Sequence, residues 1–171
     1  MSESNITKKA IACALKELLI EKSFDKITIN DITARCGLNR QTFYYHFEDR
    51  YDLMNWIYYN EVFLPLVEDL NEENYGLSFK KFFQKMSSEK VIYQNVLSDT
   101  SEYGFKEYLF SILEELISLL LNEKKATMKV RFYTYGLLGI IVDWIKTGMK
   151  ITPEQLANQL ESIILEIKKM S

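Results

Sequence analysis

Residues 28–47 read TINDITARCGLNRQTFYYHF, and this stretch decides the fold. Thr28 followed by Asp31 predicts a capping box at the start of a short helix, with Asp in place of the more usual Glu. Gly37 suits the end of that helix because a left-handed backbone costs glycine little. Asn39 is a good N-cap for a second helix. The pattern therefore predicts two short helices joined by a tight turn, which is typical of a helix-turn-helix.

The second of these helices has more hydrogen-bonding side chains than packing alone requires. Phe43 and Phe47, four residues apart, are expected to anchor its inner face. The first turn and the outward face then carry the residues predicted to contact base edges, which are Arg40, Gln41 and Tyr44. Arginine pairs with guanine and glutamine with adenine in the major groove. Tyr45 and His46 lie near the helix end, where their polar groups are expected to reach DNA phosphates.

Core packing is the usual role of aromatic side chains at helical spacing. Here the two phenylalanines already supply a core, and burying Tyr44, Tyr45 and His46 would require partners for three polar groups in one turn. A helix that faces DNA is therefore the favoured interpretation. A zinc site at His46 is disfavoured because the chain holds no other His and no Cys at ligand spacing.

The composition limits the other functions of the chain. Among 171 residues, 47% are hydrophobic and only 6 are Gly and 2 Pro, which predicts an all-α protein with long helices. Two cysteines, 13 and 36, form no disulfide framework, so a reducing cytoplasm is expected. The polar N-terminus shows no secretory signal and no apolar run is long enough to span a membrane. No catalytic or phosphate-binding motif is present, so we expect no enzyme activity, cofactor or metal.

The formal net charge of −3 does not by itself favour a nucleic-acid partner. Residues 1–56 hold 8 Lys/Arg and 8 Asp/Glu, so this part is neutral. DNA binding must then depend on where the charges lie and on the doubling of contacts in a dimer. Four basic residues either contact phosphates or are ordinary solvated surface: Lys8, Lys9, Lys26 and Arg35. Arg50 is the exception, since it begins the helix directly after the predicted DNA-facing helix.

Helical patterns continue along the rest of the chain. The first helix is expected to start near Ser4 or Asn5, and a fourth to begin after Asp49 and run toward Val62, where Pro65 kinks or ends it. Residues 68–74 are expected to form a loop. Further helices are expected at 77–86, 89–99, 104–122, 126–149 and 153–169. This organisation predicts a three-helix DNA-binding domain at 1–48 and a helical dimerisation and regulatory domain at 49–171.

Two apolar stripes in the body predict a four-helix dimer interface. Gly136 and Gly139 are expected to permit close approach of the helices. The predicted interface consists of Tyr133, Leu137, Ile141 and Trp144 on one helix and Leu156, Leu160, Ile163 and Ile167 on the next. The alternative is that both stripes serve only the core of a single chain.

The body is also rich in aromatic residues, which either line an effector cavity or form ordinary core. Core is the favoured interpretation for most of them. The candidate pocket residues are Tyr93, Tyr108, Phe132 and Asp143. Asp143 is included because it is the one charge expected to be buried, within an otherwise apolar helix.

The head of the chain resembles the TetR family of bacterial transcriptional regulators over about residues 6–60. The Gly37 turn, the block Tyr44–Phe47, and Arg50 followed by Leu53 correspond to the signature of that family. The resemblance implies an all-helical homodimer with a DNA-reading head and a larger body that dimerises and binds an effector. By position it implies base contacts from Arg40, Gln41 and Tyr44. It implies phosphate contacts from Thr28, Thr42, Tyr45, His46 and Arg50.

Two positions depart from the family pattern. Gln41 stands where a small residue is frequent, which predicts an additional base contact. Arg50 replaces a more usual lysine, and so keeps the charge but adds a forked donor geometry.

The segment FYTYGLLGIIVDWIKTGMK, residues 132–150, is similar to a short subgroup that includes regulators of dihydroxyacetone kinase operons. Some of that subgroup are described as activators that work with a kinase-like partner. The expected function is therefore a dimeric regulator that binds a palindromic operator and is controlled by a small molecule or a partner protein. The alternative is a helical protein-interaction module in which DNA binding is secondary.

Overall fold

The computed structural model describes residues 3–70, 75–97 and 104–169, and in these ranges it contains helices and no strand. The expected all-α fold is confirmed. The chain forms two compact units, and neither is a single continuous segment. The first comprises Met1–Tyr58 and Val91–Phe105, and the second comprises Tyr59–Lys90 and Lys106–Ser171. The predicted boundary after residue 48 lies inside the first unit and stays a prediction.

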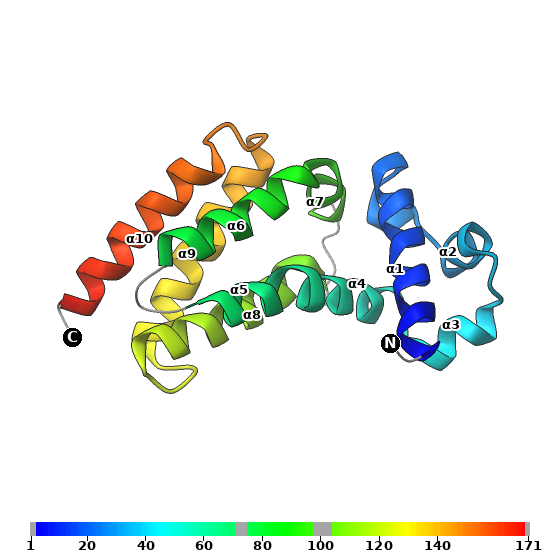
Figure 1. Ribbon diagram of the computed structural model, residues 1–171, viewed down its shortest axis with the longest axis horizontal. Coiled ribbons are helices and arrows are strands. Elements are labelled where there is room, and N and C mark those ends of the chain that lie inside the picture. The colour runs from blue at the N-terminus through cyan, green and yellow to red at the C-terminus, as the bar shows by residue number, and fades with distance from the viewer. Residues whose placement is uncertain (1–2, 71–74, 98–103, 170–171) are drawn as a thin grey trace. The chain divides into compact units, whose positions relative to one another are not determined.

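The first unit begins with α1 (Glu3–Glu21), followed by the short 3-10 turn η1 (Phe24–Lys26). The helix-turn-helix consists of α2 (Ile29–Cys36) and α3 (Arg40–His46), and α4 (Arg50–Tyr58) follows directly. The helix α7 (Lys90–Val96) completes this unit. Both α2 and α3 pack against α1, as Figure 1 shows for the blue and cyan helices.

Local signals explain where α2 and α3 begin and end. Thr28 and Asp31 form a reciprocal capping box, in which each side chain bonds the backbone amide of the other. Gly37 ends α2 with φ of 69°, in the left-handed region that favours glycine. The Asn39 side chain accepts a hydrogen bond from the Thr42 amide at 2.8 Å and so caps α3. The three predicted features of the helix-turn-helix are confirmed.

The core of the first unit is apolar and closely packed. Its fully buried side chains include those of Ile11, Leu15, Leu19, Phe24, Ile27, Ile32, Phe43, Leu53 and Tyr93. The helix α7 is tied to α1 by a hydrogen bond from Asn95 Nδ2 to the Leu19 carbonyl, 2.7 Å long. A segment from the middle of the chain thus completes the unit that holds the helix-turn-helix.

The second unit begins with a π-helical turn, η2 (Tyr59–Phe63), and α5 (Leu64–Asp69), which has Pro65 in its first turn. The predicted interruption at Pro65 is therefore present. The other helices are α6 (Tyr75–Ser88), α8 (Phe105–Leu121), α9 (Met128–Lys146) and α10 (Pro153–Lys169). These bounds agree with the predicted ranges to within a few residues. Of the predicted loop at 68–74, Glu68 and Asp69 belong to α5 instead, and residues 71–74 lie outside the described residues.

The longest packing contact of the second unit runs between α6 and α10, which lie side by side in Figure 1. Glu161 of α10 accepts a hydrogen bond from the Gly76 amide in the first turn of α6, at 2.9 Å. The ring of Phe83 meets that of Trp144 edge to face at 5.5 Å, which joins α6 to α9. None of the described helices has the length and hydropathy that a membrane crossing requires.

Candidate nucleic-acid interface

The helix α3 separates its side chains into an apolar inner face and a polar outer face. Phe43 and Phe47 are buried, as predicted, and pack against each other with ring centroids 5.9 Å apart. The outer face presents four exposed side chains, those of Arg40, Gln41, Tyr44 and Tyr45. Tyr45 is 82% exposed, far more than its ring size alone would favour in an isolated protein. This arrangement is typical of a helix whose outer face binds a polar partner.

Two of the predicted base-contacting residues hold each other in place. Arg40 Nη2 donates a hydrogen bond to the Tyr44 hydroxyl at 3.0 Å. The Arg40 guanidinium also lies 5.7 Å from the centre of the Tyr44 ring. This pairing, one helical turn apart, restricts the rotamers of the arginine and so lowers the entropy that a further contact of its side chain would cost.

The two flanking residues of α3 lie partly in the surface. Thr42 is half-buried, and its hydroxyl donates to the Asn39 side-chain oxygen at 3.1 Å. His46 is also half-buried and meets the Tyr45 ring edge to face at 4.9 Å. Both lie on the rim of the outer face, beside the exposed Tyr44 and Tyr45.

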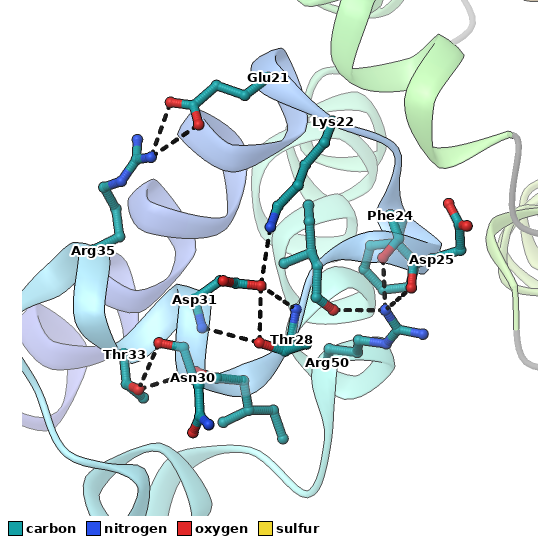
Figure 2. Close-up of polar contacts among 12 residues, drawn as sticks. Glu21, Lys22, Phe24, Asp25, Thr28, Asn30, Asp31, Thr33, Arg35 and Arg50 are labelled. Atoms are coloured by element: carbon teal, nitrogen blue, oxygen red, sulfur yellow. Dashed lines mark hydrogen bonds and ion pairs between the residues drawn. The ribbon is translucent and has the colours of Figure 1, made fainter.

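The hydroxyl of Thr28, a predicted phosphate contact, is hydrogen-bonded within the protein (Figure 2). Its hydroxyl donates to Asp31 Oδ2 at 2.8 Å and accepts from the Asp31 amide. Lys22 donates to the same carboxylate oxygen at 3.0 Å. The amide of Thr28, followed by the Lys22 ammonium and the Thr28 hydroxyl, holds the pKa of the Asp31 carboxyl at about 2, below its ordinary value of 3.8. The hydroxyl proton is therefore directed at the Asp31 carboxylate, and the phosphate contact of Thr28 stays a prediction.

Arg50, the other predicted phosphate contact, is likewise turned inward (Figure 2). Its Nη1 donates to the carbonyl oxygens of Phe24 at 2.6 Å, Asp25 at 3.2 Å and Ile27 at 2.7 Å. The guanidinium lies 4.7 Å from the centre of the Phe24 ring. This bonding was not foreseen from the sequence, and the phosphate contact of Arg50 stays a prediction.

Of the four other basic residues considered, the structure resolves the role of two. Arg35 bonds Glu21 at 2.9 Å and Glu17 at 3.4 Å, so it belongs to a surface ion-pair network between α1 and α2. Lys8 extends its ammonium over the Phe47 ring, 5.3 Å from the centroid. This cation–π contact places a positive charge beside the end of α3.

The candidate effector residues divide between the two units. Tyr93 is buried in the first unit, whereas the other three belong to the second. Asp143 is exposed, contrary to the expected buried charge, because its side of α9 faces solvent. Phe132 is 71% exposed. Tyr108 is half-buried, and burial, with a smaller effect of Tyr59, raises its pKa to about 12. The expected burial of Asp143 is therefore wrong, and the four-residue effector site stays a prediction.

A groove of about 640 Å³ opens instead between α8, α9 and α10. Its lining is apolar apart from Arg131. Five of the predicted dimer residues line it, which are Tyr133, Leu137, Leu160, Ile163 and Ile167. Exposed apolar side chains of α9, Met128, Phe132, Tyr135 and Ile140, line it as well.

The other three predicted dimer residues serve the core of the second unit. Ile141, Trp144 and Leu156 are at most 5% exposed. The Trp144 indole nitrogen donates to the Ile151 carbonyl at 2.8 Å, which fixes the ring inside the turn that joins α9 to α10. These three residues are therefore corrected from interface to core. Among the described residues, no three or more His, Cys, Asp or Glu side chains gather as a metal site would require.

Comparisons with known proteins agree with this architecture. Residues 11–56 match the family described as bacterial regulatory proteins, tetR family, and residues 73–166 match a transcriptional regulator C-terminal region. The HTH-type dhaKLM operon transcriptional activator DhaS of Lactococcus lactis subsp. lactis (strain IL1403) is 28% identical over 130 residues, which cover 74% of this chain and 67% of DhaS.

Solved structures show the same fold. A dihydroxyacetone kinase operon activator DhaS superposes with a TM-score of 0.73 at 21% identity, covering 96% of this chain and 97% of that one. A TetR transcriptional regulator from Streptococcus agalactiae 2603V gives 0.67 at 22% identity, with 95% of both chains covered. The helix-turn-helix, the two family matches and the shared fold lead to one conclusion: the chain belongs to the TetR family of transcriptional regulators.

Proposed function

We propose that this regulator binds a palindromic operator as a homodimer and reads it with the outer face of α3. The observation that carries the proposal is the exposure of Arg40, Gln41 and Tyr44 together on that face. These three residues contact base edges in the major groove, where arginine and glutamine have specific pairing geometries. Phosphate contacts come from Thr42, Tyr45 and His46 along the rim of the same face.

The preformed Arg40–Tyr44 pair supports base reading over simple charge attraction. Residues 1–56 are neutral, so long-range attraction contributes little to affinity. An arginine held by a neighbouring hydroxyl at 3.0 Å instead favours a defined geometry toward one base. Specificity for a short half-site is the expected consequence.

The homodimer forms through the outward face of α9 together with α10. Met128 and Phe132 are 84% and 71% exposed, one helical turn apart, and Ile163 lies across the groove. Added Cβ atoms at Gly136 and Gly139 would meet nothing within 4 Å, so the backbone of α9 is open to a close neighbour. Pairing with a second copy covers this apolar surface and brings two α3 helices to one palindrome.

Control by a small molecule or a partner protein in the cytoplasm completes the proposal. Both comparisons include a protein named DhaS, described as an activator of a dihydroxyacetone kinase operon. Activation, as opposed to repression, is therefore the first direction of regulation to test. In vitro transcription from the promoter beside the selected operator distinguishes activation from repression.

Selection of duplexes from a randomised pool tests the central claim. The wild-type protein should enrich a palindromic sequence, and its affinity should fall as salt rises. Arg40→Ala and Tyr44→Ala should weaken binding to that duplex, whereas Lys150→Gln, an exposed charge loss in the second unit, should not. Enrichment of no sequence, together with recovery of a stable protein partner, would favour the alternative of an interaction module.

A further inference from the structure

We propose that Arg50 is a positioning residue that sets operator specificity. Its side chain bonds the backbone just before α2 and so joins the two ends of the helix-turn-helix; this connection is called the bracket below. The inference rests on the proposed function, because it concerns how α3 is held for reading DNA. Arg50 is the first residue of α4, and it lies three positions beyond Phe47, the C-cap of α3. Its side chain returns to the turn that precedes α2.

The Arg50 socket is made of backbone oxygens and aromatic rings. Nη1 donates to three carbonyls, and the shortest two, from Phe24 and Ile27, are 2.6 and 2.7 Å long. The guanidinium lies 4.7 Å from the Phe24 ring centre and 5.3 Å from that of Tyr51. These two rings also meet edge to face at 5.2 Å. A cation that donates to neutral carbonyls and lies over aromatic rings is fixed by geometry more than by charge.

The position of the socket explains its effect on DNA reading. Ile27 directly precedes Thr28, the N-cap of α2, so the bond from Arg50 to its carbonyl joins the chain just before α2 to the chain just after α3. The bond spans 23 residues, and the whole helix-turn-helix lies between its ends. Asp49 caps the start of α4 by accepting from the amides of Tyr51 and Asp52, which holds the backbone of Arg50. The bracket therefore limits how far α3 tilts on α1.

Lysine is not expected to replace Arg50 in this role. Its ammonium carries the same charge, but its side chain is shorter and lacks the planar group that lies over the Phe24 ring. A phosphate contact, in contrast, needs only a positive charge within reach of the DNA backbone. Arg50→Lys therefore separates the two roles, and Arg50→Gln shows what loss of the charge adds.

The experiment measures equilibrium binding of full-length wild type, Arg50→Lys and Arg50→Gln to the duplex that the wild type selects and to a scrambled duplex. Each measurement is repeated over a series of salt concentrations, at a temperature where thermal melts show each variant folded. For both variants we expect affinity for the selected duplex to fall roughly three- to thirty-fold, with affinity for the scrambled duplex and the salt slope unchanged. Lys150→Gln, an exposed charge loss in the second unit, is the control and should retain wild-type affinity.

Amide exchange supplies a second readout of the bracket. The amides of Lys26 and Ile27 bond the carbonyls of Ser23 and Phe24 within the same turn. Their exchange should accelerate in Arg50→Lys, while amides of α6 in the second unit keep wild-type rates. A purely stabilising role for Arg50 would lower the melting temperature and leave the affinity of the folded protein unchanged.

Three results would overturn the inference. They are wild-type affinity of Arg50→Lys for the selected duplex, a salt slope lowered by about one in Arg50→Gln as for a lost phosphate contact, and an equal loss of affinity for both duplexes. If the wild-type protein selects no duplex, the proposed function fails and the bracket has no DNA-binding consequence. The two failures are therefore distinguishable.

Discussion

The outer faces of α3 and α9 are both unusual for solvent-facing helices, in opposite ways. The face of α3 concentrates hydrogen-bonding groups on aromatic and guanidinium side chains, whereas the face of α9 is apolar, with Met128 and Phe132 largely exposed. The face of α3 suits a polar surface that is recognised through individual hydrogen bonds. The second suits a copy of itself, where area and close approach stabilise the contact. In the proposed function, recognition and association therefore belong to separate helices.

The two faces also differ in what supports them. The helix α3 has seven residues, too few to be stable alone, and it depends on the Asn39 cap and on two buried phenylalanines. The helix α9 has 19 residues and packs several buried side chains against its own unit. Changes in local capping should therefore affect the α3 face much more than the α9 face.

The largest effect is expected from a charge on the α9 face. Phe132→Glu places two carboxylates at a two-fold interface and should weaken dimerisation roughly a hundredfold, because like charges facing each other are costly. Operator affinity should fall with it, while the monomer keeps its helical content. Analytical ultracentrifugation measures the dimer constant. Leu77→Glu, at an exposed apolar site on α6, is the control, and an unchanged dimer constant in Phe132→Glu would place the interface elsewhere.

A smaller effect is expected on the α3 face from Arg40→Ala. Loss of a bidentate base contact should lower operator affinity roughly ten- to a hundredfold, corresponding to about 1–3 kcal/mol, and relax discrimination at one base position. Stability should be unchanged because Arg40 is exposed. Fluorescence anisotropy with single-base variants of the operator makes the measurement. Equal losses on all duplexes would identify Arg40 as a phosphate contact instead.

Matched cap removals test the difference in support. Asn39→Ala and Thr127→Ala each remove a capping side chain, at the start of α3 and of α9 respectively. Each of these side chains accepts a hydrogen bond from a backbone amide in the first turn of its helix. Each should lower the free energy of unfolding by about 1 kcal/mol. Only Asn39→Ala should also weaken operator binding by the folded protein, by several-fold. Urea denaturation measures the stability and fluorescence anisotropy measures the operator binding. Equal losses of operator affinity in the two variants would show that the two faces do not differ in their dependence on capping.

The smallest expected effect is a pH dependence confined to the first unit. The pKa of Asp31 is about 2 when folded and has an ordinary value of 3.8, so its contribution to stability is present above pH 3.8 and is lost as the pH falls to about 2. Asp31→Asn should be less stable than wild type at pH 5, and the difference should shrink toward pH 2. Thermal melts over this range check it. A difference that grows with acidity would contradict the assignment.

The sequence predicted what local signals encode. The caps at Thr28 and Asn39 and the left-handed turn at Gly37 depend on residues three or four positions apart, so they could be found without coordinates. The polar outer face of α3 followed from the same periodicity. The socket of Arg50 could not be predicted, because its partners are backbone carbonyls 23 to 26 residues away, which leave no side-chain signature.

The errors in the second unit have a related cause. The helix α9 is apolar on two sides, and its periodicity does not show which side is covered by the rest of the unit, so the predicted stripe included residues of the covered side. Ile141 and Trp144 lie on the covered side, and Phe132 on the open one. Asp143 was expected to be buried for the same reason, since its neighbours in sequence are apolar on both sides.

The hydrogen bond between Asn95 and the Leu19 carbonyl has a consequence for how the chain acquires its structure. It joins residues 76 positions apart, so the unit that contains the helix-turn-helix cannot be completed until α7 has been synthesised. During translation, α1 to α4 would leave the ribosome with the site of α7 on α1 still uncovered. A fragment that ends at Tyr58 lacks α7 altogether. It should therefore be less stable than the same unit in the whole chain.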